Sequence, residues 1–219
     1  MLRAHKHLTK KELKKDPFLI FVAQATDYVQ REWIKLVSTV LAVIVVVSVA
    51  LIIVNGSERA ERTAYDRAVE AYYTGAPESI DLLAQYADKY SSSKRAVQVM
   101  LQLANYYIAQ NDYDSAEKYY LACTREVSGD QIFGYNAFNG LGAVYEEQGQ
   151  FAQAGEIYEQ FLQKFTHSPF TDMMLFNAGK AYLSAGNTAA AERNFSAILD
   201  ATSDSELKQE AQYYLELLS

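Results

Sequence analysis

The chain contains few of the residues that cross-link a fold or interrupt its helices. It has one cysteine, three prolines and ten glycines in 219 residues. The single cysteine, Cys123, has no partner for an internal disulfide, so cysteine usage neither proves nor excludes an oxidising compartment. So little proline and glycine argues against a loop-rich all-β domain. Ala, Leu, Gln, Glu and Tyr dominate after residue 56, and this composition predicts an all-α fold.

Groups for catalysis are also scarce. Beyond the N-terminal tail the only histidine is His167, and the sequence has neither a glycine-rich phosphate loop nor clustered metal ligands. His5 and His7 are better explained as solvated tail residues than as a metal site. We therefore predict no enzyme activity, no cofactor and no metal.

The charge is distributed unevenly. Residues 1–35 carry eight Lys/Arg and four Asp/Glu, whereas residues 56–219 carry twelve and twenty-three. The C-terminal region is strongly acidic and would repel a phosphate backbone, so we expect no nucleic-acid partner. The basic tail suits an anionic lipid surface.

One long apolar run interrupts this pattern. Leu36–Val54 has nineteen residues without a charge, and fourteen of them are Val, Leu or Ile. A helix of that length spans about 28 Å, close to a hydrocarbon core of about 30 Å. A buried core helix or a cleaved signal peptide is the alternative, but the run is long for a signal core and begins 35 residues into the chain. We predict a transmembrane helix over residues 34–55.

Residues 1–33 are predicted to form a basic cytoplasmic tail with an amphipathic helix. Thr9 and Glu12 fit a capping box, and Asp16-Pro17 favours a break followed by a new helix. Apolar residues from Phe18 to Trp33 then fall on one stripe, so bilayer contact is expected over residues 17–54. An extension of the membrane helix explains the stripe equally well.

Charges close to the span do not decide its orientation. Arg31 and Lys35 precede it, and three arginines follow it within about twenty residues. The distal lysines of the tail favour a cytoplasmic N-terminus. We therefore predict a single-pass protein of a bacterial inner membrane, with the domain after the span in the periplasm.

The remainder of the chain repeats one pattern of small and aromatic residues. Small residues at positions 68, 104, 142 and 179 are spaced 36, 38 and 37 apart, and the copy at 68 is the weakest. Gly142 and Ala154 are predicted to let the two helices of a hairpin approach closely, while Tyr145 and Tyr158 fill the space beside them. The stack needs a lid, and a capping box at Ser203-Asp204-Ser205-Glu206 predicts a last helix that supplies it.

The clearest copy shows the signature of a known family, in Leu141-Gly142-x-x-Tyr145, Gly149, Phe151, Ala154, Tyr158 and Phe161. With these positions, residues 61–201 resemble the tetratricopeptide repeat family. The resemblance implies that residues 57–219 form a solenoid of about four helical hairpins with a C-terminal capping helix. It also implies that partner proteins or peptides bind a concave surface lined by the first helix of each hairpin. The architecture is similar to that of the membrane-anchored ancillary subunit of the bacterial Sec translocon.

Among the family's concave positions, carried onto this sequence, eight residues are candidates for partner binding. The amides among them could bond an extended peptide backbone, and the apolar residues could hold its side chains. The alternative, that these are ordinary helix positions without a ligand, stays open. The candidates are Gln98, Leu101, Asn105, Asn136, Asn139, Met173, Phe176 and Lys180.

These features predict a non-enzymatic, membrane-anchored scaffold or adaptor. Its exported repeats would bind proteins or peptides, in a chaperone-like way, and support protein translocation or envelope protein folding. An alternative is a homo-oligomeric structural component of an envelope or division complex. A third hypothesis makes the basic tail the functional end of the chain.

Overall fold

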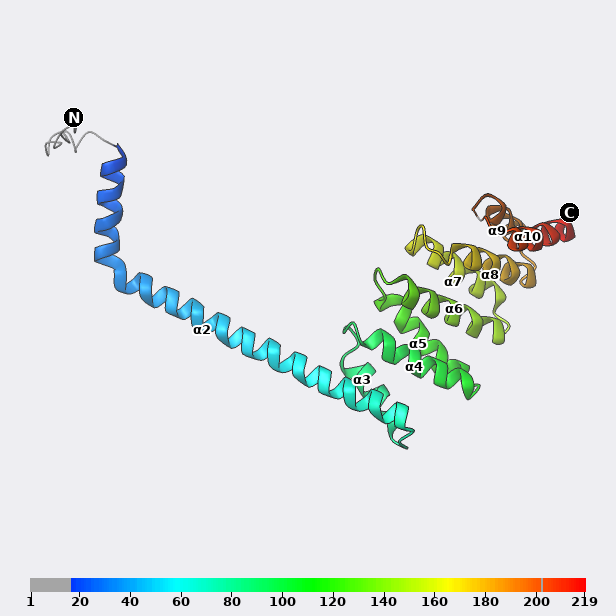
Figure 1. Cartoon of the computed structure of the whole chain (residues 1–219), viewed down its shortest axis with the longest axis horizontal. Helices are drawn as coiled ribbons and strands as arrows, with labels where there is room; N and C mark the ends of the chain where they lie inside the picture. Colours follow the sequence, from blue (N-terminus) through cyan, green and yellow to red (C-terminus); the bar gives the residue numbers. More distant parts are fainter. Residues whose placement is uncertain (1–16, 202) are drawn as a thin grey trace, which may run out of the picture. The chain divides into compact units, whose positions relative to one another are not determined.

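The computed structural model describes residues 17–201 and 203–219, and every regular element in that part of the chain is an α-helix. The predicted all-α class is therefore confirmed. The chain divides into two compact units, the first ending at Ala60 and the second covering Glu61–Ser219 (Figure 1). The tail residues before Pro17, including the capping-box pattern at Thr9 and Glu12, lie outside the described residues. The predicted boundaries after residues 33 and 55 stay predictions.

The long helix α2 (Pro17–Thr74) carries the apolar segment. It begins at a proline, whose missing N–H costs nothing in the first turn of a helix. The apolar run is helical, as expected, and no part of its most apolar window is buried within the chain. Ser38 and Thr39 each donate their hydroxyl to the carbonyl of Lys35, at 2.9 and 2.8 Å. The helix thus satisfies these polar groups by itself.

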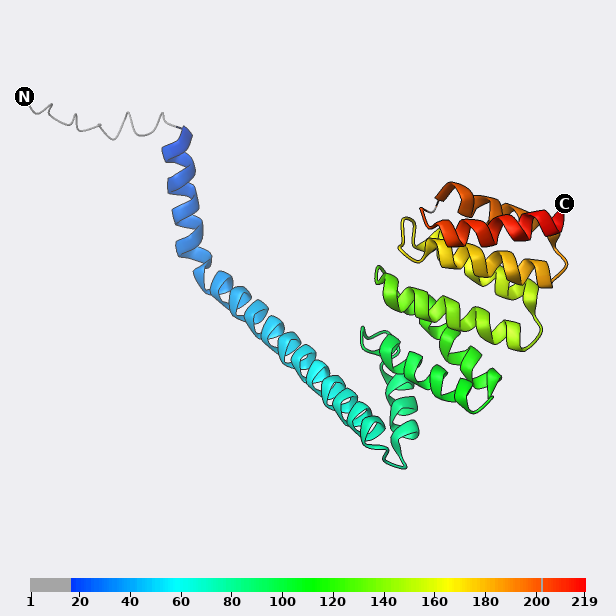
Figure 2. The same ribbon diagram turned by 45° about the vertical axis from the view of Figure 1, so that its right-hand side comes forward.

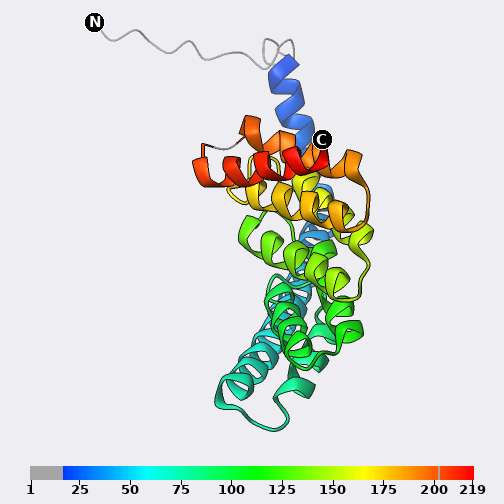
Figure 3. The same ribbon diagram turned by 90° about the vertical axis from the view of Figure 1, so that its right-hand side faces the viewer.

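The second unit is a stack of helical hairpins. The end of α2 packs against α3 (Ser79–Lys89), where the ring centroids of Tyr65 and Tyr86 are 5.7 Å apart. Three further hairpins follow along the chain. Figures 2 and 3 show them lying one after another, with the last helix, in red, at the end of the stack. The later helices are α4 (Ala96–Ala109), α5 (Tyr113–Glu126), α6 (Gln131–Glu147), α7 (Phe151–Lys164), α8 (Thr171–Ser184), α9 (Thr188–Ala201) and α10 (Ser205–Leu218).

Each hairpin turns at a residue with a positive φ. Gly75, Asn111, Gly149 and Gly186 have φ between 58° and 74°. Glycine and asparagine tolerate this left-handed conformation, which ends a helix and redirects the chain. The next residue donates its N–H back into the helix, as at Gln150, whose N lies 2.7 Å from the carbonyl oxygen of Tyr145. The repeat pattern had placed the turns at these positions.

Glycines inside the helices give room to aromatic rings. A methyl group on Gly142 would collide with the ring of Tyr158, and one on Gly179 would come within 2.7 Å of the ring of Phe195. Both rings are buried. The predicted close approach of the two helices at Gly142 is therefore present.

The predicted lid also forms, but its cap differs by one residue. The N-cap of α10 is Asp204, whose carboxylate accepts the N–H groups of Glu206 at 2.9 Å and Leu207 at 3.3 Å. The sequence pattern had pointed to Ser203 as the capping residue. Aspartate caps a helix as well as serine does. The residue types therefore do not decide between Ser203 and Asp204, and the backbone conformation does.

Candidate peptide-binding face

The eight candidate residues lie on three helices, α4, α6 and α8, and we call the surface that they mark the first-helix face. Two amides on α4 have their oxygens occupied by tyrosines. Tyr65 donates its hydroxyl to Oε1 of Gln98 at 2.9 Å, and Tyr120 donates to Oδ1 of Asn105 at 2.6 Å. These bonds fix the amide orientation and leave the NH₂ groups without a partner within the described residues.

The amides of α6 add further donors. Asn177 donates its Nδ2 to Oδ1 of Asn139 at 2.9 Å, so Asn139 is also held by its oxygen. Asn136 is exposed and has no hydrogen-bond partner in the described part of the chain. An array of NH₂ donors with tethered oxygens is suited to the carbonyl oxygens of a peptide backbone.

The apolar candidates differ in exposure. Leu101 is only 7% exposed and belongs to the core, so its side chain offers little surface to a partner. Met173 is 50% exposed at the start of α8. Phe176 is half-buried, and its ring contacts those of Phe195 and Tyr214 with centroid distances of 6.0 and 5.8 Å.

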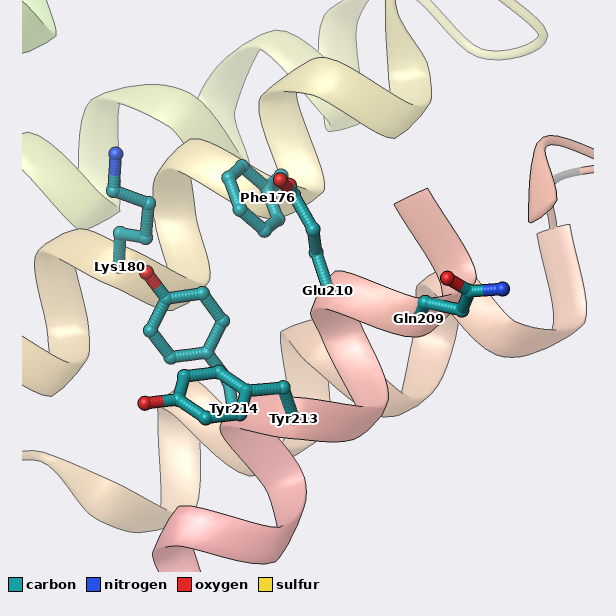
Figure 4. Close-up of a pocket in the computed structure, with 6 residues that line it drawn as sticks. All are labelled: Phe176, Lys180, Gln209, Glu210, Tyr213 and Tyr214. Carbon is teal, nitrogen blue, oxygen red and sulfur yellow. The ribbon is translucent and has the colours of Figure 1, made fainter. Parts of the chain in front are cut away.

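Phe176 and Lys180 form one wall of an open groove between α8 and α10 (Figure 4). Its volume is about 500 Å³. The ammonium of Lys180 lies 5.6 Å from the centroid of the Phe176 ring, within range of a cation–π interaction. We call this site the α8–α10 groove; its lining residues are Phe176, Lys180, Gln209, Glu210, Tyr213 and Tyr214.

A half-buried carboxylate lies on the same face. Burial raises the pKa of Glu146 above its ordinary value, although the hydrogen bond from Tyr158 and the charge of Lys180 act in the opposite direction. The Tyr158 hydroxyl donates to Oε1 of Glu146 at 3.2 Å. The Lys180 ammonium and the Glu146 carboxylate therefore influence one another across adjacent hairpins.

Comparison with protein families identifies the hairpins. Residues 97–126 and residues 135–203 each match a family described as tetratricopeptide repeat. These segments are tetratricopeptide repeats. The first match covers α4 and α5, and the second begins in α6 and ends after α9. The face marked by the eight candidates is thus made by the first helix of three successive repeats.

Solved structures agree with this fold. A crystal structure of a tetratricopeptide repeat protein from Parabacteroides merdae is similar at 16% identity and a TM-score of 0.56, covering 73% of this chain and 60% of that one. TPR-like repeats of a putative kinesin light chain from Podosopora anserina are similar at 19% identity and a TM-score of 0.50, covering 72% and 84%. A comparison with curated proteins found no match.

The contribution of α10 to the groove had not been predicted. The sequence pattern treated α10 as a lid, yet Tyr213 and Glu210 stand 37 residues after Phe176 and Met173. The same interval separates the small residues at 142 and 179. Carrying the repeat interval one step further would have placed both residues on the first-helix face.

Residues 17–201 and 203–219 contain no group of three or more His, Cys, Asp and Glu side chains that could hold a metal ion. Cys123 is fully buried, and burial raises the pKa of its thiol to about 12. A thiol with that pKa stays protonated at neutral pH and is a poor nucleophile.

Proposed function

We propose that this chain is a non-enzymatic, membrane-anchored scaffold whose tetratricopeptide repeats bind a partner protein or an extended peptide on the first-helix face. The proposal rests on three side-chain amides whose oxygens already accept hydrogen bonds within the chain. Gln98, Asn105 and Asn139 each bind an intramolecular donor through oxygen and leave NH₂ free within the described residues. Such donors can bind carbonyl oxygens of any extended chain, because every residue has one.

Anchoring is supported by the exposure of α2. Its most apolar 18-residue window has a mean hydropathy of 3.1 and is 0% buried within the chain. The core helix of a water-soluble domain would be covered by other elements, whereas a helix of this kind needs a lipid or protein environment. We propose that this segment spans an inner membrane with the repeats on the periplasmic side, where they would support translocation or folding of envelope proteins.

Alkaline phosphatase fused after Ser219 tests the orientation. The enzyme requires an oxidising compartment, so an active fusion is expected if the repeats are periplasmic. An inactive fusion at normal expression would place the repeats in the cytoplasm and overturn this part of the proposal.

Co-purification in mild detergent tests partner binding. The full chain, tagged at its C-terminus, is compared with an Asn136→Arg variant and with Gln153→Arg, a matched control on the second helix of the same hairpin. Both positions are exposed. We expect a defined protein to co-purify with the wild type and the control, and to be depleted from the Asn136 variant. Equal recovery from all three would contradict binding on this face.

A second candidate, self-association, is favoured by exposed apolar side chains on α10. Tyr213 and Leu217 are each 61% exposed there, and large apolar side chains on an end helix can pair with another copy. Mass measurement of the full chain in detergent micelles decides this point. A strict monomer across a hundredfold concentration range would remove the candidate.

A further inference from the structure

The α8–α10 groove has a preformed aromatic base. The ring of Tyr214 stacks on Phe195 with centroids 4.8 Å apart and planes 4° from parallel. Phe176 contacts both rings edge-on, at 6.0 and 5.8 Å. Each ring of this trio is held by the other two, so the base keeps its shape without a ligand.

The sides of the groove carry opposite charges. In Figure 4, Lys180 lies to one side of Phe176 and Glu210 to the other. Both residues are exposed, and neither has an ion-pair partner among the described residues. The groove therefore offers a cation, an apolar surface and an anion in sequence.

Tyr213 adds an exposed ring to the same site. Its side chain is 61% exposed, and its ring meets that of Tyr214 edge-on at 5.5 Å. A tyrosine with an apolar face and a free edge can cover a bound apolar side chain at low entropic cost.

We propose that the α8–α10 groove binds an extended segment of the partner in which an aromatic side chain lies between an acidic and a basic residue. The aromatic side chain packs on Phe176 beside Tyr213. The acidic residue meets Lys180, and the basic residue meets Glu210. This inference rests on the proposed function, because it names the partner chemistry of one end of the first-helix face.

The geometry of an extended chain suits this arrangement. Alternate residues point to the same side and are about 6.6 Å apart. A Glu-Ser-Phe-Ser-Lys segment thus presents its carboxylate, ring and ammonium on one side. The charges on the groove distinguish such a segment from one with charges of the wrong sign, because a wrong charge would face a like charge.

Fluorescence anisotropy with labelled ten-residue peptides tests the proposal on the full chain in nanodiscs. The parent probe has Glu-Ser-Phe-Ser-Lys within a Gly/Ser sequence, and variant probes replace Phe by Ala, Glu by Lys, or Lys by Glu. We expect the Phe-to-Ala probe to bind at least about tenfold more weakly, since a buried aromatic side chain contributes several times the thermal energy. Tyr213→Ala should also weaken the parent probe while leaving the unfolding temperature unchanged.

Charge exchange gives the decisive comparison. Lys180→Glu is expected to weaken the parent probe about threefold to fivefold, the size typical of an exposed ion pair, and to bind the Glu-to-Lys probe better than the wild type does. Glu210→Lys should show the same rescue with the Lys-to-Glu probe. Lys118→Glu and Glu192→Lys, exposed residues on α5 and α9, serve as matched controls and should change nothing.

The outcomes separate this inference from the proposed function. A parent probe that does not bind, an Ala probe that binds equally well, or charge exchange without rescue would each overturn the groove's specificity. If a co-purifying protein is depleted from the Asn136→Arg variant, the proposed function stands whatever the peptide probes show. Loss of that sensitivity would instead overturn the proposed function.

Discussion

The ring of Tyr158 lies where the side chain of residue 142 would be if that residue were not glycine. Tyr158 is 2% exposed, and its hydroxyl is bonded to Glu146 at 3.2 Å. The ring therefore has no free space into which it could withdraw. This contact sets the separation of α6 and α7, and with it the position of Asn139 and Glu146 on the first-helix face.

Gly142→Ala should destabilise the repeats. Alanine gains about 1 kcal/mol of helix propensity over glycine, but overpacking a filled core costs about 1–3 kcal/mol. The Tyr158 ring is buried and its hydroxyl is hydrogen-bonded, so we expect an overpacking cost in the upper part of that range. The net loss of unfolding free energy should be about 2 kcal/mol. Urea unfolding of the full chain in detergent, followed by circular dichroism at 222 nm, measures it.

Gly56→Ala is the matched control for that substitution. Gly56 is also helical, but nothing lies within 4 Å of the position that its Cβ would occupy. Its replacement should leave the stability of the repeats unchanged. Destabilisation equal to that of Gly142→Ala would refute the role assigned to the Tyr158 ring.

Two adjacent tyrosines of α10 should behave differently. Tyr214 stacks on Phe195, so Tyr214→Ala should cost about 1–3 kcal/mol of unfolding free energy through lost packing. Tyr213 is 61% exposed, and Tyr213→Ala should stay within about 0.5 kcal/mol of the wild type. Thermal unfolding of both variants makes the comparison, and equal effects would show that α10 is not docked as described.

Glu159 should make the stability fall in acid. Burial raises the pKa of its carboxyl, but hydrogen bonds from Asn194, Arg193 and Tyr182, at 2.9, 2.7 and 3.1 Å, outweigh burial and lower it. A lowered pKa in the folded state stabilises the protein above the unfolded value of about 4.3, and this contribution disappears as the pH falls through the folded pKa. Glu159→Gln should therefore show a shallower loss of stability below about pH 4.3. An unchanged pH profile would contradict this assignment.

Glu146 should have the opposite effect. Burial raises the pKa of its carboxyl, so the folded state binds a proton more readily than the unfolded state does. Stability then decreases as the pH rises from the unfolded value of about 4.3 through the higher folded pKa. Glu146→Gln removes this cost, and we expect a higher unfolding temperature at pH 7 that converges on the wild type in acid. A lower unfolding temperature at pH 7 would mean that the carboxylate stabilises the fold.

The helices and their framework contacts could be predicted from sequence because they depend on spacing alone. The interval of about 37 residues placed the turns, and small residues such as Gly142 identified the close contacts. The orientation of individual side chains was harder to predict from the sequence. Leu101 occupies a concave position of the family but is only 7% exposed and belongs to the core.

Contacts between repeats could not be predicted in the same way. The bond from Asn177 to Asn139 joins residues of different hairpins, and it depends on their separation in space. The α8–α10 groove has the same origin. Its residues follow the repeat interval, but the sequence pattern had been interpreted only as a lid.

Site-specific photo-crosslinking in intact membranes tests whether a partner protein binds the first-helix face. A photoreactive residue replaces Asn136 on the first-helix face or Gln153 on the second helix of the same repeat. We expect a discrete crosslinked protein from position 136, reduced by the Met173→Glu change on the same face, and none from position 153. Equal capture from both positions, or no capture from position 136, would contradict a partner-binding role for this face.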